Sequence, residues 1–190
     1  MTSTHHPAAE LLGLADSPLR QWLVLEAIPA VHEAMGESGK ASDAVTVTAL
    51  PGDAGLRRYY RMQIGERQFI VMDSSTDLPQ LKPFLDVHAR MTASGLRAPA
   101  ILAADIEQGF LVLQDFGDVL LKYILLPDDS PLPATAAQSL NELSLQQRGD
   151  RLFQQILPLL SALAQTDADN LPVYDRERLQ QEVTLLPEWC

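Results

Sequence analysis

The chain has 190 residues, 46% of them hydrophobic, and a formal net charge of −11. This length allows one ordinary domain, or one small and one partial domain, and the apolar content is typical of a globular protein. The acidic balance argues against nucleic acid or an anionic membrane as a partner, because both bind basic surfaces. The single cysteine, Cys190, excludes an intrachain disulfide. The single cysteine and the lack of an apolar run long enough to span a membrane together favour a soluble, cytoplasmic protein.

The first predicted element is an amphipathic helix that follows a short tail. Asp16, Ser17 and Pro18 combine capping residues with a proline suited to the first helical turn. Apolar residues then recur at helical spacing to about Ala34: Leu19, Trp22, Leu23, Ala27 and Val31. We expect residues 1–40 to form this tail and helix.

A glycine-containing loop between two predicted strands is the first candidate binding site. Residues 45–49 alternate valine or alanine with threonine, the pattern of a half-buried strand. Four loop residues are expected to bend the chain and expose backbone N–H groups: Gly52, Asp53, Ala54 and Gly55. Arg57 and Arg58 add two positive charges, so the loop is a candidate clamp for an anion, most commonly a nucleotide phosphate. A polar hairpin bend with two solvated arginines also explains these residues.

The next segments complete a predicted sheet. Residues 68–73 form a third strand, and residues 99–105 and 110–115 form two more, joined by a hairpin loop in which Gly109 takes a positive φ. Between the third and fourth strands, residues at helical spacing predict a helix that ends at Gly95: Leu81, Phe84, Leu85, His88 and Met91. The predicted fold class is therefore α+β, with a five-stranded, largely antiparallel sheet and one helix inserted after the third strand.

The remaining sequence predicts helices around a linker. Residues 119–126 suggest a short apolar helix, whereas residues 127–147 are rich in Pro, Ser, Ala, Gln and Asp and are expected to be flexible or weakly ordered. Residues 152–164 form the clearest amphipathic helix, with Pro158 inside it, and Asp175 caps a last helix. Because the apolar faces of these two helices lack their full partners, we expect self-association through them.

Residues 52–61 carry a resemblance to a known family. They read Gly-Asp-Ala-Gly-Leu-Arg-Arg-Tyr-Tyr-Arg. This resembles the Gly-Asp-Ala-Ser-Phe-Arg-Arg-Tyr-Phe-Arg signature of the aminoglycoside-phosphotransferase-like bacterial kinases. The closest branch phosphorylates N-acetylmuramate and N-acetylglucosamine at the anomeric hydroxyl during peptidoglycan recycling. Further stretches are similar to that branch, in the same order: residues 69–73, 99–105, 109–117, 171–175 and 186–189.

The resemblance implies a fold and an activity. Residues 41–117 would form a protein-kinase-like amino-terminal lobe, residues 118–150 a hinge and linker, and residues 151–190 the start of an α-helical carboxyl-terminal lobe. The implied activity is ATP-dependent phosphorylation of a sugar hydroxyl with Mg²⁺.

It also implies roles for particular residues. The loop from Gly52 to Gly55 would cover the ATP phosphates, Arg57 and Arg58 would flank them, and the hinge that binds adenine would be three residues: Asp115, Phe116 and Gly117. These three residues end the fifth strand with no catalytic loop before them, so they are not the magnesium-binding motif of protein kinases.

Two departures from the kinase pattern concern the chemistry. Met72 stands where kinases carry a phosphate-pairing lysine. No histidine follows His88, which we interpret as a packed residue, so the His-x-Asp-x-x-x-x-Asn loop is absent. Asp167 and Asp169 are better explained as helix-end residues than as a catalytic pair. The sequence thus predicts a truncated or split kinase, inactive alone, with its Mg²⁺ ligands in a missing lobe. The alternative is a non-catalytic nucleotide-binding or protein-interaction module built on a kinase lobe.

Overall fold

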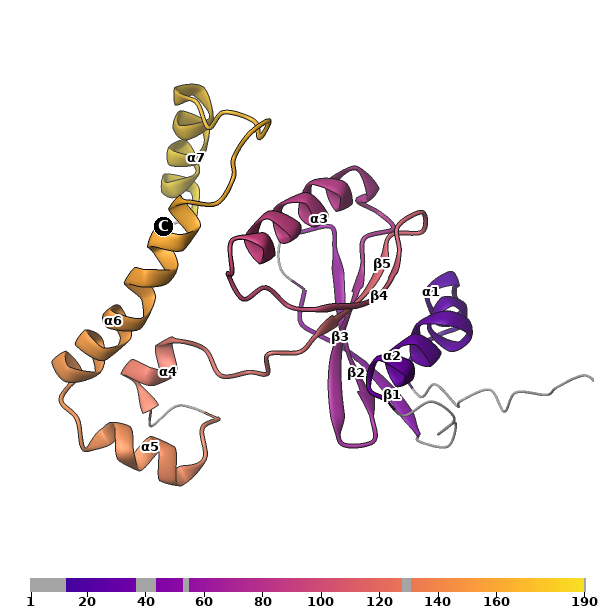
Figure 1. The fold of residues 1–190 in the computed structure, drawn as a ribbon, viewed down its shortest axis with the longest axis horizontal. Helices are drawn as coiled ribbons and strands as arrows, with labels where there is room; N and C mark the ends of the chain where they lie inside the picture. The colour runs from indigo at the N-terminus through magenta and orange to yellow at the C-terminus, as the bar shows by residue number, and fades with distance from the viewer. Residues whose placement is uncertain (1–12, 37–43, 53–54, 128–130, 190) are drawn as a thin grey trace, which may run out of the picture.

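A single antiparallel sheet forms the centre of the protein. The computed structural model describes residues 13–36, 44–52, 55–127 and 131–189. Its strands are β1 (Val45–Ala49), β2 (Arg58–Ile64), β3 (Arg67–Asp73), β4 (Ile101–Asp105) and β5 (Phe110–Gln114). They lie in the order β1-β2-β3-β5-β4, and every neighbouring pair is antiparallel. The predicted five-stranded sheet is confirmed (Figure 1).

Both faces of the sheet are covered, so neighbouring residues of a strand belong to different cores. Val71 and Met72 in β3 are both fully buried, but on opposite faces. The larger core packs Val71 and its face against α1 (Pro18–Trp22), α2 (Ile28–Ala34) and the π-helical turn between them. The smaller core packs Met72 and its face against α3 (Leu78–Ala93).

The first helical segment has the predicted start and one feature that was not predicted. Ser17 caps it, since its Oγ accepts a hydrogen bond from the Arg20 N–H at 3.2 Å. The turn Leu23–Ala27 is π-helical, and the Ile28 N–H donates to the Leu23 carbonyl five residues back. Pro29 has no N–H to donate and its ring crowds the preceding turn, which accounts for the widened turn.

The segment from α3 to β5 follows the prediction closely. Gly95 ends α3 with a φ of +76°, and Gly109 turns the β4–β5 hairpin with a φ of +85°. The half-buried His88 hydrogen-bonds through its Nε2 with the Pro99 carbonyl at 2.7 Å. His88 therefore ties α3 to the segment before β4, in agreement with a packed residue.

The carboxyl-terminal part corrects the prediction of a flexible linker at residues 127–147. Among the described residues of that range, α5 (Ala134–Asn141) forms and α6 (Leu145–Ala164) begins. Before it, α4 (Lys122–Leu125) falls within the short helix predicted at residues 119–126, and after it α7 (Arg176–Trp189) follows Asp175 as predicted. Ser144 begins α6 with a capping box, in which Ser144 Oγ accepts from the Gln147 N–H and Gln147 Oε1 accepts from the Ser144 N–H. This local signal outweighs the loop-like composition around it.

These helices form an arm beside the sheet, reached through the segment that leaves β5 (Figure 1). No residue of α6 is buried, and large apolar side chains along it are about half exposed or more, among them Phe153 at 62% and Leu157 at 59%. The predicted unpartnered apolar face is confirmed. Within the described ranges, every helix is too short or too polar to cross a lipid bilayer.

Candidate functional site

The glycine-containing loop connects β1 to β2. Asp53 and Ala54 lie outside the described residues, so only the two ends of the loop are placed. A Cβ added at Gly52 would meet no atom within 4 Å, which leaves room for a ligand beside its backbone. At the other end, the Thr76 hydroxyl donates to the Leu56 carbonyl at 2.9 Å and holds the loop against the β3–α3 turn.

Arg57 lies against the amino-terminal half of α3. Its Nη2 donates to the Gln80 carbonyl at 3.0 Å, and its guanidinium carbon is 5.2 Å from the centroid of the Phe84 ring. Its Nε is buried without a hydrogen bond and lies 3.9 Å from the Asp77 carboxylate. A depression of about 340 Å³ adjoins this side chain, lined by Gly55, Leu56, Arg57, Tyr59, Asp77 and Gln80.

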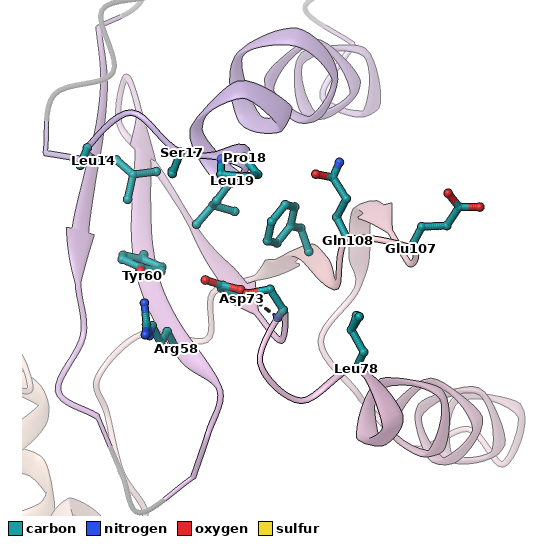
Figure 2. A pocket seen from close by; sticks show the side chains of 13 residues that line it. Leu14, Ser17, Pro18, Leu19, Arg58, Tyr60, Asp73, Leu78, Glu107 and Gln108 are labelled. Carbon is teal, nitrogen blue, oxygen red and sulfur yellow. Dashed lines mark hydrogen bonds between the residues drawn. The ribbon is translucent and has the colours of Figure 1, made fainter.

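Arg58 lies on the other face of the sheet. It lines a pocket of about 480 Å³ together with Tyr60, Asp73 and residues at the start of α1, including Ser17 (Figure 2). Arg58 and Asp73 are directly opposite each other on β2 and β3. The expectation that Arg57 and Arg58 converge on one ligand is therefore wrong, because successive residues at the start of a strand project to opposite faces.

The predicted hinge follows β5 immediately. Asp115 Oδ1 accepts a hydrogen bond from the Gly117 N–H at 2.7 Å, and Gly117 takes a φ of +77°, so the segment turns sharply. Phe116 is 52% exposed, and the Arg97 guanidinium lies 5.3 Å from its ring centroid. The backbone N–H and C=O of Phe116 make no hydrogen bond to any residue that the structure describes.

Arg61 is the functional candidate that the sequence analysis missed. Its Nε donates to Asp115 Oδ2 at 2.6 Å and its Nη1 to Asp118 Oδ2 at 2.8 Å, while its Nη2 reaches Asp118 Oδ1 at 2.9 Å and Asp115 Oδ1 at 3.5 Å. These bonds, first to Asp118 and then to Asp115, raise the pKa of Arg61. In return, the bond from Arg61 lowers the pKa of Asp118.

The cluster of Arg61, Asp115 and Asp118 can be predicted only when the pairing of the strands is known. Arg61 pairs with Ile70 of β3, and Ile70 pairs with Leu113 of β5, two residues before Asp115. The order of strands in the sheet is needed to see that Arg61 and Asp115 meet.

The described residues contain no preformed cluster of metal-binding side chains. No group of three or more His, Cys, Asp or Glu side chains within them could hold a metal ion. Asp167 accepts the Asp169 N–H at 2.9 Å and forms an ion pair with Arg90 at 3.5 Å. Asp167 and Asp169 thus shape the turn after α6, as expected.

Two features on the α3 side of the sheet could each receive one part of an elongated anionic ligand. Arg57 stands just before β2, and Arg61 reaches the hinge from four residues further along the chain. Four residues of strand span about 13 Å, a distance that a nucleotide bridges between its base and its phosphates. At one end, the Arg57 guanidinium beside the glycine-containing loop suits an anionic group such as a phosphate. At the other end, the backbone N–H and C=O of Phe116, which have no partner among the described residues, suit the polar edge of an aromatic base.

Comparison with known proteins finds relatives of modest identity. No protein-family model matches the chain. It is 34% identical over 138 residues to a protein of Pseudomonas aeruginosa, covering 72% of this chain and 35% of that protein. A protein of Pseudomonas putida is 30% identical, over 77% of this chain and 38% of its own length. One of Neisseria meningitidis is 29% identical, over 75% of this chain and 38% of its own length.

Each of these three relatives is named N-acetylmuramate/N-acetylglucosamine kinase. The similarity covers about three quarters of this chain, which spans little more than a third of the length of each relative. The comparison supports the resemblance to a sugar kinase.

Proposed function

We propose that the chain is the nucleotide-binding part of an ATP-dependent phosphotransferase. Its acceptor would be a hydroxyl of an amino sugar, N-acetylmuramate or N-acetylglucosamine, in cytoplasmic recycling of cell-wall sugars. The observation that carries this proposal is the similarity to three relatives bearing that kinase name over about three quarters of the chain. The site on the α3 face supports it independently, since its charge and its open backbone groups suit a nucleotide.

In this proposal ATP would lie along the α3 face of the sheet. Arg57 and the loop that runs from Gly52 to Gly55 would hold the phosphates, because Arg57 lines the depression at the end of that loop. The hinge residues Asp115, Phe116 and Gly117 would bind the adenine edge through the backbone. Arg58 has no part in it, since it lines the pocket on the opposite face.

The chemical groups for phosphoryl transfer would come from residues outside these 190. ATP supplies the phosphoryl group, and Mg²⁺ and a proton-accepting aspartate are the usual further requirements. The described residues hold no cluster of three or more His, Cys, Asp or Glu side chains, and the sequence has no His-x-Asp segment after His88. We therefore assign no transfer step to residues of this chain.

A second candidate is a non-catalytic nucleotide-binding or interaction module. One observation favours it: the exposed apolar face of α6, which suits a partner helix more than a solvated catalytic part. The nucleotide-binding form of this module shares the nucleotide site with the kinase and differs only in whether phosphoryl transfer follows binding.

Calorimetric titration of the purified chain with ATP tests the shared claim. We expect saturable one-site binding, without phosphorylation of N-acetylmuramate or N-acetylglucosamine by the chain alone. Absence of saturable binding would contradict the kinase and the nucleotide-binding form of the module, and would leave the interaction module. Recovery of sugar phosphorylation on adding the carboxyl-terminal two thirds of a relative would decide for the kinase over the module.

A further inference from the structure

Arg61 holds both ends of the hinge at once. Asp115 and Asp118 bracket Phe116 and Gly117, and the guanidinium bonds to both carboxylates. Because β3 lies between β2 and β5, the Arg61 side chain must pass over β3 to reach them. It therefore sets where the segment leaving β5 lies relative to the sheet.

The cluster is unlike an ordinary surface ion pair. The Arg61 side chain is 19% exposed and that of Asp115 only 5%, so their charges are largely removed from water. Asp118 is 69% exposed and adds little to folding, yet it receives two of the bonds. Asp118 is not required for the buried ion pair between Arg61 and Asp115. Its bonds to Arg61 instead fix the far end of the hinge.

Arg61 itself is poorly suited to bind a phosphate. A guanidinium has five N–H groups, and these bonds occupy all but one of them. Two carboxylates also outweigh its single positive charge, so the cluster repels an anion. The phosphates of a ligand on this face belong at Arg57, away from this cluster.

We propose that Arg61 is a positioning residue that presents the Phe116 backbone to the base of the bound nucleotide. This inference rests on the proposed function. The N–H and C=O of Phe116 lie between the two anchored carboxylates and have no partner within the described chain. Holding them in place in advance saves the cost of ordering the segment on binding.

Comparing ATP with inorganic tripolyphosphate tests this role, because tripolyphosphate carries the charge without the base. In Arg61→Gln we expect ATP binding to weaken roughly tenfold, about one well-made hydrogen bond, while tripolyphosphate binding changes less than about twofold. Asp118→Asn keeps the buried pair and should weaken ATP binding by a smaller factor in the same base-dependent way. If Arg61→Gln does not fold, the comparison of ATP with tripolyphosphate in Asp118→Asn still tests the inference. Arg58→Gln, the same change on the opposite face, is the matched control and should alter neither affinity.

Three outcomes would overturn the inference. Equal weakening of ATP and tripolyphosphate in the folded variants would make Arg61 a phosphate ligand. Unchanged affinity for both, with only a lower melting temperature in Arg61→Gln, would make it a brace of the fold. Base-dependent weakening in Arg58→Gln as well would remove the link to the hinge. Failure of the unmodified chain to bind ATP contradicts the proposed function itself, whereas binding that is insensitive to Arg61 and Asp118 contradicts this inference alone.

Discussion

Arg61 Nε donates to Asp115 Oδ2 at 2.6 Å, which joins two residues 54 positions apart in the sequence. The bond connects the second strand of the sheet to the segment that leaves its last strand. Both side chains are largely shielded from water. This pair therefore influences the stability of the sheet and the placement of the hinge together.

The pair should be costly to break. Arg61→Gln is expected to lower the free energy of unfolding by about 3 kcal/mol, because it leaves the Asp115 carboxylate buried without its partner. Asp118→Asn should cost much less, since that carboxylate is largely exposed. Urea denaturation measures both. Equal losses in the two variants would contradict the different burial of Asp115 and Asp118.

The two neighbouring arginines of the loop should behave differently. Arg57→Ala is expected to weaken ATP and tripolyphosphate binding roughly tenfold or more, because a charged hydrogen bond to phosphate is worth about 1.5–3 kcal/mol. Arg58→Ala should leave both affinities unchanged, since Arg58 lines the pocket on the opposite face. Calorimetric titration of both variants is the measurement. A larger loss of affinity in Arg58→Ala than in Arg57→Ala would contradict the proposal, because it would place the phosphates on the face opposite α3.

Much of the fold could be predicted from the sequence because it depends on local patterns. Alternation in residues 45–49 predicted β1, Ser17 with Pro18 predicted the start of α1, and Gly109 predicted the last hairpin. The helix α5 is not predicted, because the composition of residues 127–147 is typical of a loop and α5 has no side-chain cap. The capping box at Ser144 is a separate signal, which marks the start of α6 inside the same range.

The site was harder to predict because it depends on register. The sequence suggests one charged pair at Arg57 and Arg58, although an extended chain sends the two side chains to opposite faces. Arg61 meets Asp115 only because β2, β3 and β5 are adjacent in that order. That order is a tertiary property, which local sequence patterns do not determine.

Gly109 should tolerate no side chain. In Gly109→Ala the new Cβ would lie 2.7 Å from Leu78 Cδ2 and 3.0 Å from the backbone of Ser74 and Ser75, at a φ of +85°. We expect a loss of about 2–4 kcal/mol from strain and crowding together. Gly95→Ala is the matched control, with a φ of +76° and no atom within 4 Å, and should lose only about 1 kcal/mol. Similar melting temperatures for the two variants would contradict the close packing at the hairpin.

Acid should weaken the protein partly through two carboxylates. The bond from Arg61 lowers the pKa of Asp118, and the backbone and side chain of Gln108 lower that of Asp105. A lowered folded-state pKa contributes stability that is complete above the ordinary value of 3.8 and is lost as the pH falls through the folded value. The double variant Asp105→Asn/Asp118→Asn should therefore lose less stability than the unmodified chain between pH 4 and pH 2. Parallel acid profiles from urea titrations would contradict the two assignments.

The apolar face of α6 should make the chain self-associate. Replacing Leu157 and Leu160, which are 59% and 53% exposed, with glutamine is expected to reduce both hydrophobic-dye binding and the associated fraction in light scattering. Gln154→Ala on the same helix is the control and should change neither. A chain that stays monomeric at high concentration and binds no dye would contradict this expectation.

Mapping backbone amide chemical shifts by NMR during titration with ADP tests whether a nucleotide lies on the α3 face of the sheet. We expect saturable shifts at Gly52, Gly55 and Arg57, and at Phe116 and Gly117, because the nucleotide would span from the loop to the hinge on that face. The chemical shifts of amides near Arg58 and Asp73 should change little. Shifts confined to that opposite pocket, or no saturable shifts at all, would contradict it.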